Sequence, residues 1–243
     1  LRSVLVESSS MVILSGHGGT GKTALIKDLH DQIDGTAPFF IFKASEFKIT
    51  NVNDIFVPYG PFSFTDFIEE HKNIEEKYIV IDSAEKLSDI ESLTVFHEFL
   101  SRLLANGWKI IFTTRYSFVD DLKWQLLELY NCTFKVINIE NITKDELFLL
   151  GKKYSFKVHE NERLLNLLLN PFYLNEYLRN YTEAGASQTY SDFRRLIWNK
   201  KIQNSLYRKN NVHIERERCF LEIAKTRANS GFFYVADGNL NKE

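Results

Sequence analysis

The most constraining feature of this chain is the run from Gly16 to Thr23, Gly-His-Gly-Gly-Thr-Gly-Lys-Thr, which matches the phosphate-binding pattern G-x-x-x-x-G-K-[ST] at every fixed position. The apolar residues Met11 to Leu14 come before it and predict a buried strand, and Thr23 to Leu29 predict a helix that leaves the loop. A nucleoside-triphosphate site requires strand, loop and helix in this order. The chain is therefore expected to contain an α/β unit built around this loop.

Each residue type in this run has a physical role. Glycines let successive backbone N–H groups point at one anion, and the N-terminus of the following helix adds a partial positive charge. Lys22 is expected to reach the β- and γ-phosphates, and the Thr23 hydroxyl to ligate a Mg²⁺ ion that bridges them. His17 occupies a variable position, where a phosphate contact and a bystander role are both open. The expected nucleotide contacts are Gly16, His17, Gly18, Gly19, Thr20, Gly21, Lys22 and Thr23.

A second buried strand, Tyr78 to Asp82, ends in an acid at the edge where α/β sheets bind ligands. Asp82 is therefore expected to be the carboxylate on the magnesium side of the site. Many such ATPases place a second acid directly after it to orient the attacking water, but here that residue is Ser83. Glu85 is the nearest replacement for this catalytic base, and the alternative is that Glu85 merely caps a following helical turn.

A third strand is predicted within the run from Trp108 to Arg115, and its polar residues Thr113, Thr114 and Arg115 should emerge at the same edge of the sheet. A guanidinium there would stabilise transition-state charge and distinguish ATP from ADP. Arg115 is therefore a candidate sensor of the γ-phosphate, and the alternative is a solvated surface arginine.

Further periodic segments predict the fold class, a doubly wound parallel α/β sheet of about five strands followed by a helical subdomain. Pro38 to Phe42 and Thr133 to Ile139 complete the strands. Helices are predicted over 64–71, 93–105 and 118–130, and then over 147–154, 160–169, 171–181 and 192–207. A capping box over Thr143 to Glu146 predicts the start of a helix, and the strand patterns stop there. The chain is therefore expected to consist of an α/β domain over 1–140 and a helical subdomain over 141–243.

Composition narrows the class of protein. The chain has 243 residues, 44% of them hydrophobic, and a formal net charge of −2, which gives no overall attraction to nucleic acid or anionic lipid. No apolar run approaches the roughly 20 residues that span a membrane, and no targeting segment is visible, so a cytoplasmic protein is expected. Cys132 and Cys219 fit no metal-ligand spacing and are expected to be reduced thiols.

The two ends indicate an excised fragment. The chain begins with Leu1, and its one methionine, Met11, is very close to the phosphate loop. The run from Gly231 to Gly238 has the pattern of an unfinished strand and turn. We therefore expect the partners of this chain to include further domains of a longer parent protein.

Together, the phosphate loop, the strand ending at Asp82 with its following Glu85, the strand ending at Arg115, and the helix opening Asn170-Pro171-Phe172-Tyr173-Leu174 resemble the STAND class of P-loop ATPases, which includes NACHT and NB-ARC domains. The resemblance covers most of residues 10 to 205. It implies that a proline of the helical subdomain packs near the adenine, and Pro171 is the matching residue. On physical grounds alone, Pro171 is simply a good first residue of a helix.

Basic pairs in the second half, such as Arg194 with Arg195 and Lys200 with Lys201, suggest nucleic-acid binding or a sensor near ATP. Alternation of acids and bases from Glu215 to Arg218 instead favours a solvated helix face. A Ras-like GTPase would carry an Asn-Lys-x-Asp motif, which is absent, and no arginine-bearing lid of a small-molecule kinase interrupts the strands.

The resulting expectation is an ATP-binding module, bound to ATP or ADP with Mg²⁺, that hydrolyses ATP within a larger STAND-type signalling or defence protein. Nucleotide state would then control domain arrangement or homo-oligomerisation. Two alternatives remain: an AAA+-type ATPase that acts on DNA as a loader or transposition ATPase, and a module that binds nucleotide without hydrolysing it.

Overall fold

The computed structural model describes residues 10–33, 35–130, 134–158, 160–184, 189–203 and 212–230. Two compact units divide the chain: one comprises residues 1–142 together with Asn170–Phe172, and the other comprises 143–169 and 173–243. None of the helices in the described residues is both long enough and apolar enough to cross a membrane.

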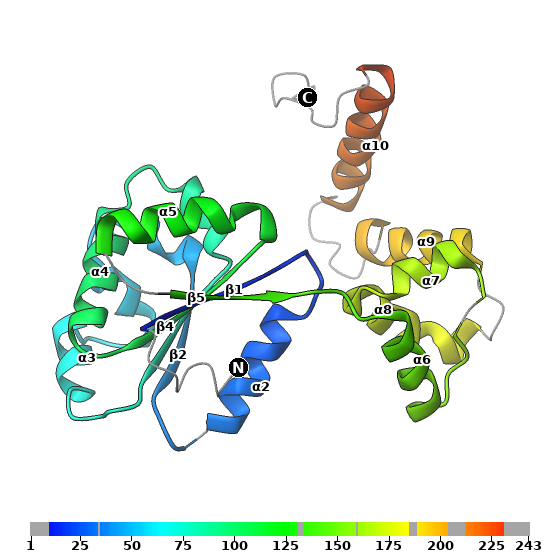
Figure 1. Ribbon diagram of the computed structural model, residues 1–243. Helices are drawn as coiled ribbons and strands as arrows, with labels where there is room; N and C mark the ends of the chain where they lie inside the picture. The colour runs from blue at the N-terminus through cyan, green and yellow to red at the C-terminus, as the bar shows by residue number, and fades with distance from the viewer. Residues whose placement is uncertain are drawn as a thin grey trace. The chain divides into compact units, whose positions relative to one another are not determined.

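The first unit is built on a five-stranded parallel sheet, in the order β2-β3-β4-β1-β5 (Figure 1). The strands are β1 (Met11–Gly16), β2 (Phe39–Lys43), β3 (Tyr78–Asp82), β4 (Lys109–Thr114) and β5 (Phe134–Ile139). The apolar residues of β1, β3 and β4 are completely or almost completely buried, as expected for central strands of a parallel sheet. The predicted doubly wound parallel sheet is confirmed.

Helices cover both faces of this sheet. Because successive side chains of a strand point to opposite faces, Met11 and Ile13 pack into one core and Val12 and Leu14 into the other. The first core is rich in aromatic rings and is completed by α3 (Phe64–Glu70), α4 (Thr94–Ala105) and α5 (Val119–Tyr130). The second core is completed by α2 (Lys22–Ile33), the helix that follows the phosphate loop.

Several short helices connect these elements: η1 (Ala44–Phe47), η2 (Val52–Tyr59), η3 (Ala84–Asp89) and η4 (Tyr116–Phe118). The sequence patterns did not predict η1 or η2. Both have a buried phenylalanine, Phe47 in η1 and Phe56 in η2, that packs into the aromatic core. Tertiary packing therefore stabilises these turns, which are too short to show a helical period.

The second unit is helical, with α6 (Lys144–Lys153), α7 (Glu162–Leu168), α8 (Pro171–Ala184), α9 (Tyr190–Trp198), the π-helical turn η5 (Asn199–Gln203) and α10 (Val212–Ser230). The predicted capping box before α6 is confirmed, since Thr143 N–H donates to Glu146 Oε2 at 2.7 Å. Helix α8 has its first two residues, Pro171 and Phe172, in the sheet unit and continues into the helical unit.

The predicted helices over 147–154, 160–169 and 171–181 differ from α6, α7 and α8 by up to three residues at an end, and one other prediction differs by more. The segment 192–207 was expected to be a single helix, but α9 begins at Tyr190 and ends at Trp198, where η5 follows. The early start has a clear cause, because Thr189 caps the helix and forms a reciprocal capping box with Asp192. Residues 204–207, Cys132 and the predicted strand over 231–238 lie outside the described residues.

Candidate nucleotide site

The phosphate loop lies between the end of β1 at Gly16 and the start of α2 at Lys22. Gly19 and Gly21 have φ angles of +84° and +94°, which side chains disfavour. Gly16 is needed for another reason: a Cβ there would lie 2.5 Å from the Ile139 carbonyl oxygen of β5. Gly18 is exposed, and open space surrounds the position of its missing side chain. The glycines therefore serve both backbone conformation and close packing.

The Lys22 side chain folds over its own loop. Its Nζ donates to the carbonyl oxygens of Gly16 at 2.8 Å and His17 at 2.9 Å. The Thr20 hydroxyl also donates to the His17 carbonyl oxygen, at 3.0 Å. The Lys22 ammonium group and the Thr20 hydroxyl therefore hold the loop in shape through its own carbonyl groups.

Thr23 is exposed in the first turn of α2. The ring of His17, which is also exposed, stacks on Tyr116 of η4 at a centroid distance of 6.0 Å. The predicted phosphate contact of His17 stays a prediction.

The start of α8 lies against this loop. Asn170 Nδ2 donates to the Gly18 carbonyl oxygen at 2.9 Å, and the Phe172 N–H donates to the Gly19 carbonyl oxygen at 3.1 Å. A Cβ on Gly19 would approach Asn170 Oδ1 to 2.6 Å, so glycine permits this contact. Pro171, which the resemblance suggested as an adenine neighbour, therefore lies between two residues that bond to the loop. The contact of Asn170 with the loop was not predicted.

Asp82 ends β3 and is fixed by a threonine from the neighbouring strand. Thr113 Oγ1 donates to Asp82 Oδ1 at 2.6 Å and accepts a hydrogen bond from Ser83 N–H at 2.9 Å. Strand β4 lies between β3 and β1, so the carboxylate is two strand spacings, roughly 10 Å, from the end of β1. The sequence had placed Thr113 at this edge but did not predict that it positions Asp82.

Ser83 turns the chain sharply after β3, with a left-handed φ of 59°, and η3 begins at the next residue. This turn returns Glu85 toward the site, and Glu85 Oε1 lies 3.2 Å from Arg115 Nε. The Glu85 side chain is only 12% exposed, whereas that of Arg115 is 61% exposed. The candidate base and the candidate sensor thus form an ion pair with each other.

Two buried oxygen atoms in this region have no hydrogen-bond partner among the described residues: Glu85 Oε2 and Thr114 Oγ1. Thr114 ends β4 directly beside Ser15 of β1. Because buried polar atoms are nearly always bonded, an orphan pair at the ligand-binding edge of a sheet is typical of a site that receives a polar ligand or water.

The charged groups of the site influence one another. Burial is the largest influence on the pKa of Lys22 and lowers it below its ordinary value. The negative charge of Glu85 raises this pKa, the positive charge of Arg115 lowers it, and Asp82 raises it. The structure therefore brings Lys22, Asp82, Glu85 and Arg115 into one electrostatic cluster, although they come from three separate stretches of sequence.

The protein side of the site fits a magnesium nucleotide better than a metal ion alone. Among the described residues, no group of three or more His, Cys, Asp or Glu side chains is arranged to hold a metal. Mg²⁺ commonly takes one or two protein carboxylates and completes its shell with water and substrate phosphates. A threonine hydroxyl and one aspartate, Thr23 and Asp82, are a donor set of this kind.

Comparison with known proteins bears on the fold of this chain. No protein-family model matches the chain, and no curated protein matches it. A solved DNA replication initiation factor has a TM-score of 0.50 at 14% identity, over 95% of this chain and 68% of that one. The Drosophila ORC bound to DNA has a TM-score of 0.43 at 14% identity, over 93% and 64%. AMPPCP-bound DnaA from Aquifex aeolicus has a TM-score of 0.47 at 15% identity, over 100% and 72%.

The chain thus spans about two thirds of the length of these structures. At such low identity, the likeness concerns the fold alone. The chain therefore shares the fold of this DNA replication initiation factor, an α/β unit with a five-stranded parallel sheet and a phosphate loop after β1, followed by a helical unit.

Proposed function

We propose that this chain binds ATP and hydrolyses it with the help of Mg²⁺, as the nucleotide-dependent module of a larger protein. The observation that carries the proposal is the convergence of Lys22, Asp82, Glu85 and Arg115 beside a loop whose sequence matches the phosphate-binding pattern. The structural likeness to a DNA replication initiation factor supports the same class at the level of the fold.

In this proposal, each residue has a distinct task. The loop N–H groups and Lys22 bind the phosphates, and Thr23 and Asp82 hold the magnesium ion, whose charge would stabilise the phosphoryl group during transfer. Thr113 keeps the Asp82 carboxylate oriented. Glu85 accepts the proton of the attacking water, which requires that its carboxylate be reachable from the γ-phosphate. Arg115 both holds Glu85 and carries positive charge for the transition state.

The loop also offers a route for a nucleotide-controlled switch. Asn170 and Phe172 bond to the Gly18 and Gly19 carbonyl groups, and α8 continues from them into the helical unit. A nucleotide that reorders the loop would change these bonds and so move the start of α8. We propose that ATP occupancy is transmitted in this way to the helical unit and to further domains of a parent chain.

The direct test is ATP binding and turnover by the purified chain with Mg²⁺. Lys22→Ala removes a charged contact to phosphate and should weaken ATP binding by roughly 10- to 100-fold. Lys27→Ala changes an exposed lysine on the same helix and is the matched control. Glu85→Gln should retain binding and lower turnover by roughly 100-fold to 10,000-fold. Tight binding without any turnover in the native chain would instead support the non-hydrolysing module.

Of the two candidate functions for such an ATPase, we propose that this chain acts on DNA rather than in STAND-type signalling. The fold likeness favours it, and so does a pocket of about 740 Å³ in the helical unit. Tyr190, Trp198 and Phe220 line this pocket together with Arg194 and Arg195. Aromatic rings beside arginines are what single-stranded nucleic acid needs for base stacking and backbone neutralisation. The segment Asn170 to Leu174 remains the feature that supports the STAND alternative, because its start bonds to the loop.

A DNA-binding measurement separates the two classes. A fluorescent single-stranded oligonucleotide should bind in an ATP-dependent and salt-dependent manner, and Arg194→Ala should weaken it. Arg163→Ala, at an exposed arginine of α7 outside the pocket, is the matched control. ATP-dependent self-association without any DNA binding would favour the STAND alternative.

A further inference from the structure

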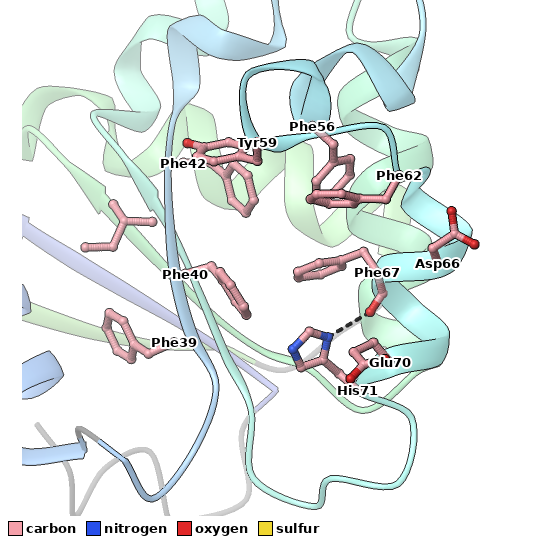
Figure 2. Close-up of a pocket in the computed structure, with 11 residues that line it drawn as sticks. Phe39, Phe40, Phe42, Phe56, Tyr59, Phe62, Asp66, Phe67, Glu70 and His71 are labelled. Carbon is pink, nitrogen blue, oxygen red and sulfur yellow. Dashed lines mark hydrogen bonds between the residues drawn. The ribbon is translucent and has the colours of Figure 1, made fainter.

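The sheet unit has a second concave surface, which the nucleotide site does not use. It is a pocket of about 600 Å³ between β2, η2 and α3. Figure 2 shows aromatic rings from all three elements converging on it, with Asp66 and Glu70 on the side of α3. Its aromatic walls are Phe40, Phe42, Phe56, Tyr59, Phe62 and Phe67. We call this the β2 pocket.

The strand beside the pocket, β2, is an edge of the sheet, since β3 is its only partner among the strands of the described residues. In a parallel pair, the backbone groups of alternate residues face the partner strand. Tyr78 N–H donates to the Pro38 carbonyl oxygen at 2.9 Å, so residues 38, 40 and 42 face β3, and Phe39 and Ile41 face outward. The outward N–H of Lys43 is capped by Glu46 Oε2 at 3.0 Å. The open edge is therefore confined to Phe39 and Ile41.

The middle of this edge lacks a protective residue, although Pro38 precedes the strand and Lys43 ends it. A charge or a proline in the middle of an edge strand normally discourages pairing with another chain. Here the middle of the outward edge is Ile41, whose residue exposure is 47%. Tyr59 and Phe62 on the pocket wall are 65% and 38% exposed. An apolar edge strand beside an open aromatic pocket is the arrangement that receives an added strand.

The pocket rim carries net negative charge. Asp66 caps α3 by accepting hydrogen bonds from Ser63, and one of its two oxygens makes these bonds. Glu70 lies one turn later on α3, is exposed, and forms no ion pair within the part of the chain that the structure describes. The nearby Lys72 pairs with Glu69, and the buried Lys77 donates to the His71 carbonyl oxygen. The rim thus complements a positively charged partner.

We propose that the β2 pocket binds an extended peptide segment of a partner protein, which pairs with the outward backbone of Phe39 and Ile41. An apolar side chain of the peptide fills the aromatic pocket. A lysine or arginine two positions away lies on the same face of the added strand, about 7 Å further along, and faces Asp66 and Glu70. Backbone pairing supplies affinity, and the apolar and basic side chains supply specificity.

A second copy of this chain is a poorer occupant. Antiparallel pairing of two β2 strands about Ile41 would bring Lys43 of the other copy beside Phe39. Lys43 shares a face with Phe39 and Ile41 by alternation, whereas Phe40 and Phe42 face the pocket. The strand's basic side chain would therefore point to the wrong face for the acidic rim.

The test is selection of random eight-residue peptides, displayed on phage, against the whole purified chain in the presence of ATP and Mg²⁺. We expect enriched peptides with an aromatic or large aliphatic residue two positions from a lysine or arginine. Synthetic versions of them should lose binding to Ile41→Pro, which removes an outward N–H and leaves the bonds to β3 in place. Glu70→Lys should weaken binding about tenfold or more, and Glu91→Lys, an exposed acid outside the pocket, should not change it.

Three results would overturn the proposal. The first is no enrichment of any sequence pattern. The second is enriched peptides that bind Ile41→Pro and Glu70→Lys as well as the native chain. The third is concentration-dependent dimerisation that Ile41→Pro abolishes, which would assign the edge to a second copy. The Glu70→Lys variant keeps the test valid if Ile41→Pro fails to fold, and ATP turnover in the same samples shows separately whether the nucleotide site is intact.

Discussion

The candidate nucleotide site and the β2 pocket belong to the same sheet, but their side chains are fixed by different kinds of interaction. At the nucleotide site, polar side chains at the ends of β3 and β4 are fixed by directed hydrogen bonds, such as Thr113 to Asp82. In the β2 pocket, the walls are fixed by ring packing, such as Phe67 on Trp108 at 5.2 Å. The two surfaces share no residue, so substitutions in one should leave binding at the other unchanged.

The largest expected effect tests this independence. Phe67 is 6% exposed and packs on Phe40, Phe56 and Trp108, with centroid distances of 5.0, 5.1 and 5.2 Å. Phe67→Ala should lower the free energy of unfolding by about 3–5 kcal/mol, because it leaves a cavity among these rings. Urea denaturation measures the loss, and ATP affinity measured well below the unfolding transition should stay the same.

Tyr59→Ala is the control on the same pocket. Tyr59 is 65% exposed, so its removal should change the free energy of unfolding by less than about 0.5 kcal/mol. If ATP affinity fell with Phe67→Ala in folded protein, the two surfaces would be coupled and the comparison would need revision.

The next prediction compares the loss of unfolding free energy caused by substituting each of two adjacent threonines of β4. Both are buried, but the Thr113 hydroxyl bonds to Asp82 and Ser83, and the Thr114 hydroxyl has no partner in the described residues. Thr113→Val should lower the free energy of unfolding by about 1–3 kcal/mol, because it leaves a carboxylate and an N–H without their partner. Thr114→Val should be neutral or slightly stabilising in the nucleotide-free protein.

Chemical denaturation with and without ATP and Mg²⁺ checks this pair. If Thr114 Oγ1 is reserved for a ligand or its water, ATP should stabilise Thr114→Val less than it stabilises the native chain. Equal destabilisation by the two substitutions would show that Thr114 has a structural role like that of its neighbour.

These differences also explain what the sequence could predict. The phosphate loop and its flanking elements have fixed spacing, and Asp82, Glu85 and Arg115 lie at or just after the ends of apolar strands. The local sequence pattern was therefore enough to predict that they lie at one edge of the sheet. The contact of Asn170 with Gly18 joins residues 152 positions apart, and no local pattern encodes it. The sequence did not predict the β2 pocket for a similar reason. Its wall η2, with Phe56, is stabilised by tertiary packing and shows no helical period in the sequence. The role of Thr113 depends on the register of β3 with β4, which is also a long-range property.

The smallest effect concerns Ser83, the residue that directly follows Asp82 at the end of β3. Its φ of 59° costs free energy for any side chain, so Ser83→Gly should raise the free energy of unfolding by up to about 1 kcal/mol. Ser155→Gly is a matched control in the helical unit, since Ser155 has a φ of 56° and the backbone gain should be similar. Only Ser83 sets the turn that returns Glu85 to Arg115, and glycine would loosen that turn. ATP turnover should therefore fall in Ser83→Gly and remain unchanged in Ser155→Gly. Equal turnover in the two variants would contradict this expectation. It would mean either that Glu85 is not the catalytic base or that the turn at Ser83 does not position it.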